Sequence, residues 1–347
     1  MENKKSVTIH DIARALKIDS STVSRALNDN PRVSAKTKKI VQAKAKEMHY
    51  RPNTLASNLR TQKSNTIGII VPHITKYFFS TAISGIEEEA HKAGYNVIIC
   101  QSKDSEGLET ENINTLISSR VDGILLSPAI KTSKISHIQK AMESNVPIFF
   151  FDRYIKEVST TKVITDDRNT SKALTMHLLS QGIHKLAILT GDTKVSIYDN
   201  RVKGIYDAFK ESGLNAESKL IMQQINLSMD EAYNLIHSWV DKKVDFDAVF
   251  AMNDMAAIGA QRALQERGYK IPDDVLVAGF SNEPIANLVS PPITTVHQPA
   301  AEIGKLAAKK IINHIEERDK SILASETTVL DSKLIIRAST LRKGNAE

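Results

Sequence analysis

The side chains best suited to hydrogen bonding with a nucleic acid lie near the start of the chain, in the run Ser20-Ser21-Thr22-Val23-Ser24-Arg25. On a helix beginning at Ser20, the apolar Val23 and Leu27 share one face, and the hydroxyls and Arg25 project from the other. Hydroxyl and guanidinium groups bond phosphate oxygens and base edges, and a helix fits the major groove. This pattern therefore indicates a face that suits a DNA groove.

Three short helices would position that face. Thr8 precedes an apolar stripe over residues 9–16, with Asp11 placed for a capping box. Asp19 is a good N-cap for the second helix, and Ser34 opens a third that runs from Ala35 to about Met48. Two helices joined by a tight turn are typical of the helix-turn-helix. A generic three-helix bundle would show the same apolar pattern, so the pattern alone leaves both open.

The charge is unevenly distributed. Residues 1–64 hold 14 Lys/Arg and 5 Asp/Glu, a balance of +9, whereas the other 283 residues hold 32 and 35, a balance of −3. A basic module on a mildly acidic body is expected of a protein that neutralises backbone phosphates and releases counterions. A solvated basic tail is the alternative, but this segment is also patterned to fold.

From residue 66 onward, apolar strands alternate with helical stretches. The predicted strands are 67–71, 97–100, 123–126, 147–151, 186–189, 248–251 and 276–280. Such alternation predicts parallel sheets covered by helices, and there are too many units for one sheet. The expected fold is therefore a small all-α helix-turn-helix domain followed by an α/β two-lobed domain with two doubly wound parallel sheets.

The N-terminal 55 residues closely resemble the DNA-binding domain of the LacI/GalR family. The resemblance rests on Val7-Thr8-Ile9-His10-Asp11-Ile12-Ala13, residues 21–28, residues 33–37 and Tyr50-Arg51-Pro52-Asn53. It implies that Ser20, Ser21 and Arg25 read bases. It also implies phosphate contacts by Thr8, Thr22, Ser24, Asn28 and Ser34, although Ser24 could equally face its own helix.

A hinge follows this domain. Residues 53–60 can form a helix too short to persist alone in water, so we expect it to fold only on DNA against a second copy. In the family this helix pairs across the dimer in the minor groove, and Leu59 matches the leucine that wedges into the central base step. Asn53 joins the DNA-binding set on the same grounds.

The body resembles the periplasmic sugar-binding fold, whose ligand lies in a cleft beyond the carboxyl ends of the strands. The residues that match family effector contacts are Phe78, Phe79, Asp152, Arg153, Arg201, Asn253, Asp254, Phe280 and Ser281. Arg201 can bond adjacent hydroxyls or a carboxylate in fork geometry, and Asn253 offers a donor and an acceptor. Two structural alternatives stay open, because Asp152 could cap a loop and Asp254 could cap the following helix.

Two departures from sugar-responsive members concern the ligand. Ser281 stands where many of them carry an aspartate, and Leu227 stands where an aromatic residue is usual. A sugar or sugar derivative remains the expected effector, with a larger glycoside, a sugar acid or a different metabolite left open.

The expected domains are a helix-turn-helix over residues 1–50, a hinge helix and linker over 51–65, and an effector-binding, dimerising body over 66–342. Within the body, we expect an N-lobe of about 66–160 and 294–328 and a C-lobe of about 161–293 and 329–342. A homodimer on a pseudo-palindromic operator is expected, because a twofold site has two half-sites. Since only six residues follow Leu341, we expect no further tetramer-forming helix and therefore a dimer.

Other classes find little support. Common catalytic and phosphate-loop motifs are absent, and Asp166-Asp167 should point to opposite faces if they lie on a strand, so we expect no enzyme, cofactor or metal site. The start of the chain lacks an apolar signal segment, no membrane span is evident, and Cys100 is the single cysteine, which together predict a cytoplasmic protein. The alternative function is a small-molecule binding protein without a DNA role.

Overall fold

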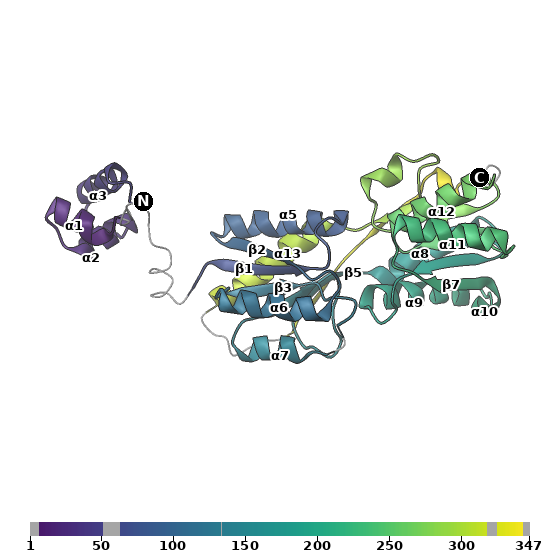
Figure 1. Ribbon diagram of the computed structural model, residues 1–347, viewed down its shortest axis with the longest axis horizontal. Coiled ribbons are helices and arrows are strands. Elements are labelled where there is room, and N and C mark those ends of the chain that lie inside the picture. Colours follow the sequence, from purple (N-terminus) through teal and green to yellow (C-terminus); the bar gives the residue numbers. More distant parts are fainter. Residues whose placement is uncertain (1–6, 51–62, 133, 318–324, 343–347) are drawn as a thin grey trace, which may run out of the picture. The chain divides into compact units, whose positions relative to one another are not determined.

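The computed structural model describes residues 7–50, 63–132, 134–317 and 325–342. The chain divides into two compact units, Met1–Ser64 and Asn65–Glu347 (Figure 1). The expected hinge helix, with Asn53 and Leu59, lies outside the described residues. In the described parts of the chain, no helix is long and apolar enough to cross a membrane.

The first unit contains three helices, as the sequence predicts. They are α1 (Ile9–Leu16), α2 (Ser20–Leu27) and α3 (Ala35–Glu47). Their shared core has Ile12, Val23, Ala26 and Val41 fully buried. Ala26, rather than Leu27, therefore completes the fully buried stripe of α2, and Leu27 is half-buried beside it.

The N-lobe of the second unit is built on a six-stranded parallel sheet in the order β11-β5-β4-β3-β1-β2. Its strands are β1 (Thr66–Val71), β2 (Asn96–Gln101), β3 (Gly123–Leu126), β4 (Ile148–Phe151), β5 (Lys162–Thr165) and β11 (Thr327–Leu330). Edge strand β2 is partly exposed. Cys100 on it is half-buried.

Alternating strand residues divide the N-lobe core between the two faces of the sheet. Ile67, Phe149 and their neighbours pack against α5 (Tyr77–Lys92) and α13 (Ala300–Glu316). Ile70, Phe150 and their neighbours pack against α6 (Glu106–Ser118) and α7 (Ser136–Glu143). Figure 1 shows these two helix pairs on opposite sides of the sheet.

Helices α5 and α13 approach closely because glycines lie at their contact. A Cβ atom added at Gly304 would overlap the backbone oxygen of Ala82, and one at Gly85 would overlap that of Ala301. The N-lobe thus depends on two helices that are far apart in the sequence.

The C-lobe contains a four-stranded parallel sheet in the order β7-β6-β8-β9. Its strands are β6 (Leu186–Thr190), β7 (Leu220–Gln224), β8 (Ala248–Ala251) and β9 (Leu276–Ala278). Its helices are α8 (Asp167–Ser180), α9 (Ser196–Glu211), α10 (Ala216–Lys219), α11 (Met229–Asp241) and α12 (Asp254–Glu266). All seven strands expected from the sequence are present in the two parallel sheets.

The lobe boundaries differ from those expected, because strand pairing continues past them. β5 pairs with β4 in the N-lobe, so this lobe continues beyond residue 160. β10 (Thr295–His297) pairs with β12 (Lys333–Ile335) in a two-stranded antiparallel sheet, and Thr294 bridges to Ala278 of the C-lobe. The described residues also include the short helices η1 (Pro284–Asn287) and η2 (Ala338–Thr340). The chain passes between the lobes three times, after β5, after β10 and after β11.

Candidate nucleic-acid interface and ligand cleft

Helix α2 presents the polar face expected from the sequence. Val23 and Ala26 anchor it in the core of the first unit. Ser21 and Arg25 are exposed, and Ser20, Thr22 and Ser24 are half-buried. This arrangement leaves hydroxyl and guanidinium donors on the outer side of α2, where they can reach acceptors on a bound nucleic acid.

Three further residues of the expected DNA set, Thr8, Asn28 and Ser34, are exposed and also form hydrogen bonds at helix ends. The Thr8 hydroxyl donates to the Asp11 carboxylate at 2.7 Å, and Ser34 Oγ accepts from the Thr37 amide at 3.2 Å. The Asn28 side-chain amide donates to the Ser24 carbonyl at 2.9 Å. Helix N-termini such as those of α1 and α3 carry free N–H groups that favour phosphate.

Most residues of the expected effector set surround one small cavity between the two lobes, of about 60 Å³. We call it the inner cavity. Members of the expected set that line it are Phe78, Phe79, Asp152, Arg153, Arg201, Asn253 and Ser281. Asp254 and Phe280 are not part of its lining. The two phenyl rings meet edge to face, with their centroids 5.4 Å apart.

Arg201 is held by three interactions. Its Nε donates to Asp167 at 2.8 Å, its Nη1 donates to the Met252 carbonyl at 2.8 Å, and its guanidinium carbon lies 3.6 Å from the centroid of the Phe280 ring. Burial raises the pKa of Asp167, and the Arg201 charge opposes that effect. Arg201 therefore has a fixed orientation at the wall of the inner cavity.

The adjacent carboxylates Asp166 and Asp167 have separate roles, as their opposed directions suggested. They lie at the start of α8 rather than on a strand. Asp166 caps the helix by accepting from the Asn169 amide at 3.1 Å, while Asp167 turns inward to Arg201. They do not form a carboxylate pair for acid–base chemistry.

Asn253 and Asp254 also differ in role. Asn253 is the N-cap of α12, accepting from the Ala256 amide at 2.8 Å and donating to the Leu227 carbonyl at 2.9 Å, yet it still borders the inner cavity. The Asp254 carboxylate is fully buried and accepts from the Thr295 hydroxyl and the Glu283 amide. Burial raises its pKa to about 6. Asp254 thus ties η1 and β10 to α12 beneath the cleft.

Asp152 and Arg153 bring opposite charges to the end of β4. Burial raises the pKa of Asp152 to about 6, although the Arg153 charge acts in the other direction. Arg153 is 3% exposed, and its Nη1 donates to Asp104 at 2.6 Å and to the Pro128 carbonyl at 3.2 Å. Its guanidinium carbon lies 5.8 Å from the centroid of the Phe79 ring.

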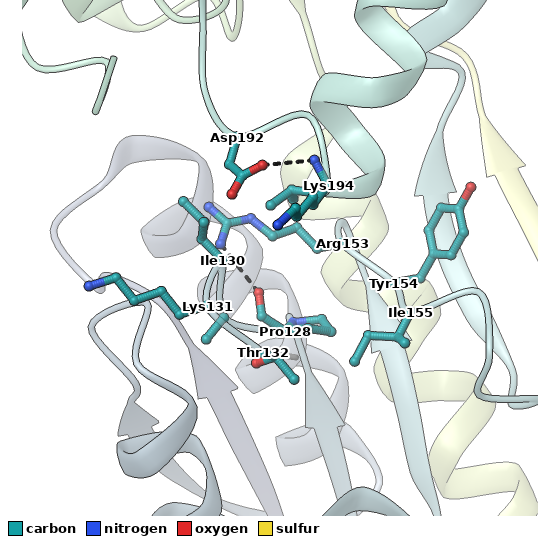
Figure 2. Close-up of a pocket in the computed structure, with 11 residues that line it drawn as sticks. Pro128, Ile130, Lys131, Thr132, Arg153, Tyr154, Ile155, Asp192 and Lys194 are labelled. Carbon is teal, nitrogen blue, oxygen red and sulfur yellow. Dashed lines mark hydrogen bonds between the residues drawn. The ribbon is translucent and has the colours of Figure 1, made fainter. Parts of the chain in front are cut away.

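A larger cavity of about 300 Å³ adjoins the same arginine. We call it the outer cavity (Figure 2). Its walls come from residues 128–132 and 153–155 of the N-lobe and from Asp192, Lys194 and Val195 of the C-lobe. Because Arg153 lines both cavities, its side chain is part of the wall between them.

Sequence reasoning missed several residues that line the inner cavity. They are Lys76, Ile197, Tyr198, Met252, Glu283 and Gln298. Most come from helix starts and loops rather than from the motifs that carried the resemblance. The sequence could have indicated Lys76, Met252 and Gln298, because each follows shortly after the end of a strand, where ligand-binding residues of this fold are expected.

Comparison with known proteins gives two family matches, which together span most of the chain. Residues 8–53 match the family described as bacterial regulatory proteins, lacI family. Residues 64–337 match periplasmic binding proteins and the sugar binding domain of the LacI family. The chain belongs to the LacI family.

Relatives of this LacI-family chain are similar over nearly their full length. The HTH-type transcriptional regulator DegA of Bacillus subtilis is 31% identical over 96% of this chain and 98% of its own. The ribose operon repressor of Halalkalibacterium halodurans is 29% identical over 98% of this chain and 99% of its own.

Solved structures agree with this assignment. A lac repressor dimer bound to operator and the anti-inducer ONPF shares the fold, with a TM-score of 0.86 at 22% identity, and the match covers 97% of this chain and all of that one. A LacI-family regulator from Enterococcus faecium with bound ribose has a TM-score of 0.70 at 28% identity, and covers 79% of this chain and 98% of that one.

Family membership confirms the predicted fold and the predicted class of function for this LacI-family chain. The fold is the expected helix-turn-helix plus two-lobed α/β domain. The protein is a DNA-binding transcriptional regulator, rather than an enzyme or a binding protein without a DNA role.

Proposed function

We propose that this chain is a cytoplasmic transcriptional repressor that binds a pseudo-palindromic operator as a homodimer, with an affinity that a sugar or sugar derivative changes. The observation that carries the proposal is the combination in one LacI-family chain of an exposed donor face on α2 and a polar cleft between two lobes. Relatives named as repressors support the direction of control.

At the DNA, Ser20, Ser21 and Arg25 are the proposed base readers. The proposed phosphate contacts are Thr8, Thr22, Ser24, Asn28 and Ser34. Asn53 and Leu59 would contribute from the hinge, outside the described residues. Two copies are needed because the hinge helix is too short to be stable without a partner.

At the cleft, Arg201 and Asn253 are the proposed centre of ligand binding. Phe78, Phe79, Asp152, Arg153 and Ser281 surround the same space, and Asp254 and Phe280 support it from below. Two regulators with this fold have been solved with ribose and with cellobiose. A ligand here changes DNA affinity only to the extent that it binds one lobe arrangement more tightly than the other.

The DNA half of the proposal is tested by selecting binding sites from a random DNA pool with the full chain, followed by titration of the selected duplex. Arg25→Ala should weaken specific binding about tenfold and relax the sequence preference at one position in each half-site. The matched control is Arg14→Ala, which removes the same charge from an exposed position on α1. Equal losses of affinity and unchanged selectivity in both variants would contradict base reading by Arg25.

The sensor half is tested by a thermal-shift screen of sugars, sugar derivatives and nucleobases, with operator titration in the presence of each compound that binds. We expect at least one compound to raise the melting temperature and change operator affinity, because both effects follow from preferential binding to one state. If no compound in a broad panel changes either quantity, the sensor half is wrong.

A further inference from the structure

Helix α2 ends in a turn that involves Arg25, one of the proposed base readers. Asn28 caps the helix, and Asp29 follows it with a φ of 52°. The Asn30 amide donates to the Arg25 carbonyl at 2.9 Å, and the Asp29 amide donates to the Ala26 carbonyl at 3.3 Å. These two bonds form a Schellman motif, in which a helix ends at a residue in the left-handed conformation. The turn after α2 therefore holds the backbone that carries Arg25.

An aspartate is not the usual residue at the left-handed position of this motif. A Cβ atom comes too close to the following carbonyl oxygen in that conformation, so glycine is the common choice. Asp29 keeps this conformation more readily if contacts from outside the turn stabilise it.

Lys38 of α3 makes such contacts. Its Nζ donates to the Asp29 carboxylate at 2.7 Å and to the Asp29 carbonyl at 3.0 Å. The Lys38 side chain is 18% exposed, whereas that of Asp29 is 84% exposed. An exposed ion pair by itself contributes little to stability. Here, however, one ammonium group binds both the side chain and the backbone of Asp29, and so restrains the conformation of the turn.

The same contacts distinguish Lys38 from the other lysines of α3. Lys36, Lys39 and Lys46 are exposed, and exposed lysines of a DNA-binding module are suited to neutralise phosphates. The ammonium group of Lys38 is mostly covered and is already bonded to a carboxylate and a carbonyl. Its charge is used within the protein.

We propose that Lys38 is a positioning residue for operator recognition, which holds Asp29 in the left-handed conformation and thereby fixes the turn that orients Arg25. Lys38 acts on sequence preference without contacting the DNA. This inference rests on the proposed reading of bases by Arg25, and it adds a residue that determines how well Arg25 does so.

The test uses the full chain, the duplex selected from the random pool, and duplexes changed at the position where Arg25→Ala relaxes the preference. Lys38→Met should reduce discrimination between these duplexes about fivefold, less than Arg25→Ala, because Lys38 acts only through the turn. The slope of log affinity against log salt should stay unchanged. A lysine that contacts a phosphate would instead weaken binding to all duplexes alike and reduce that slope by about 1.

Two further variants serve as controls. Lys44→Met removes a lysine of α3 that is 27% exposed and pairs with Glu47 in the same helix, and it should leave discrimination unchanged. Lys38→Arg keeps a cation with several N–H donors, and it should restore most of the discrimination. Amide hydrogen exchange of α1 and α3 in each variant shows whether the first unit stays folded.

A change at Asp29 tests the mechanism directly. Asp29→Gly introduces the residue that adopts a positive φ without strain, so the turn no longer depends on Lys38. In the Asp29→Gly background, Lys38→Met should change discrimination by less than about twofold.

Four results would overturn the inference. Unchanged discrimination in Lys38→Met, or an equal loss with Asp29 and with Gly at this position, would exclude an action through the turn. A salt slope reduced by about 1 would make Lys38 a phosphate contact. Loss of amide protection throughout α1 and α3 would give Lys38 only a general role in folding. If Arg25→Ala leaves the sequence preference unchanged, the proposed base reading fails together with this inference, whereas in the first three cases the role of Arg25 is retained.

Discussion

Replacing Arg201 with alanine should destabilise the C-lobe by about 3–5 kcal/mol, the cost of leaving the partner of a buried ion pair uncompensated. Arg201 and Asp167 are each 3% exposed, so the carboxylate loses its charged partner in a buried position. The change also removes the hydrogen bond to the Met252 carbonyl and the stacking on Phe280. These losses add to the same effect.

The fluorescence of Trp239 provides the assay. It is the single tryptophan of the chain and lies in the C-lobe core with Phe280, so it reports unfolding of the lobe that holds Arg201. With a urea m-value of about 2 kcal/mol per molar, the midpoint should fall by roughly 2 M. The control Arg262→Ala removes an exposed arginine of the same lobe and should leave the midpoint nearly unchanged.

A second variant separates the cost of the unpaired charge from loss of packing. Arg201→Met combined with Asp167→Leu removes both charges and keeps apolar volume, so it should recover most of the lost stability. If Arg201→Ala shifts the midpoint no more than Arg262→Ala does, or if the double variant is as unstable as the single one, the account of this buried pair is wrong.

Three further predictions concern other parts of the chain. Asp152→Asn should raise the free energy of unfolding at pH 8 by up to about 3 kcal/mol, because a pKa raised to about 6 means that ionised Asp152 destabilises the folded state. The gain in stability should vanish as the pH falls from 6 toward 4. A gain that does not depend on pH would contradict this account. Gly304→Ala should destabilise the fold by about 1–3 kcal/mol and lower the melting temperature, because the added methyl group forces α13 away from Ala82. In the comparison variant Gly213→Ala, the added methyl group meets open space, so any loss comes from the positive φ of that residue and not from a clash. A Gly304→Ala chain as stable as wild type would contradict the close packing. Leu59→Ala should weaken specific operator binding and spare weak, salt-sensitive binding, and an equal loss of both in a salt titration would argue against the wedge.

The sequence predicted local structure well in the first unit. The stripe from Ile9 to Leu16 and the caps at Thr8 and Ser34 reproduce α1 and the start of α3 to the residue. Such signals are local, because a helix depends on side chains three and four positions apart and on the groups at its ends. The motif also carried the family assignment that the comparisons confirm.

Local sequence patterns predicted the strands and boundaries of the two lobes less completely. The buried runs of the central strands were evident, but β5, β7, β10, β11 and β12 are short, partly exposed or paired with strands distant in the sequence. Their pairing depends on which strand lies alongside, a tertiary property that local patterning does not contain. The expected lobe boundaries were displaced for the same reason.

The sequence by itself determined a basic helix-turn-helix with a polar face on its second helix, and a body of alternating strands and helices. It also singled out Arg201 and Asn253. Only the tertiary structure decided how these side chains are used: Arg201 is paired with Asp167, Asp254 is buried beneath the cleft, and Arg153 lies between two cavities, where its Nε has no partner among the described residues. The reason is physical, since burial and pairing depend on residues brought together from separate lobes, whereas residue type and spacing fix only the chemistry that each side chain can offer.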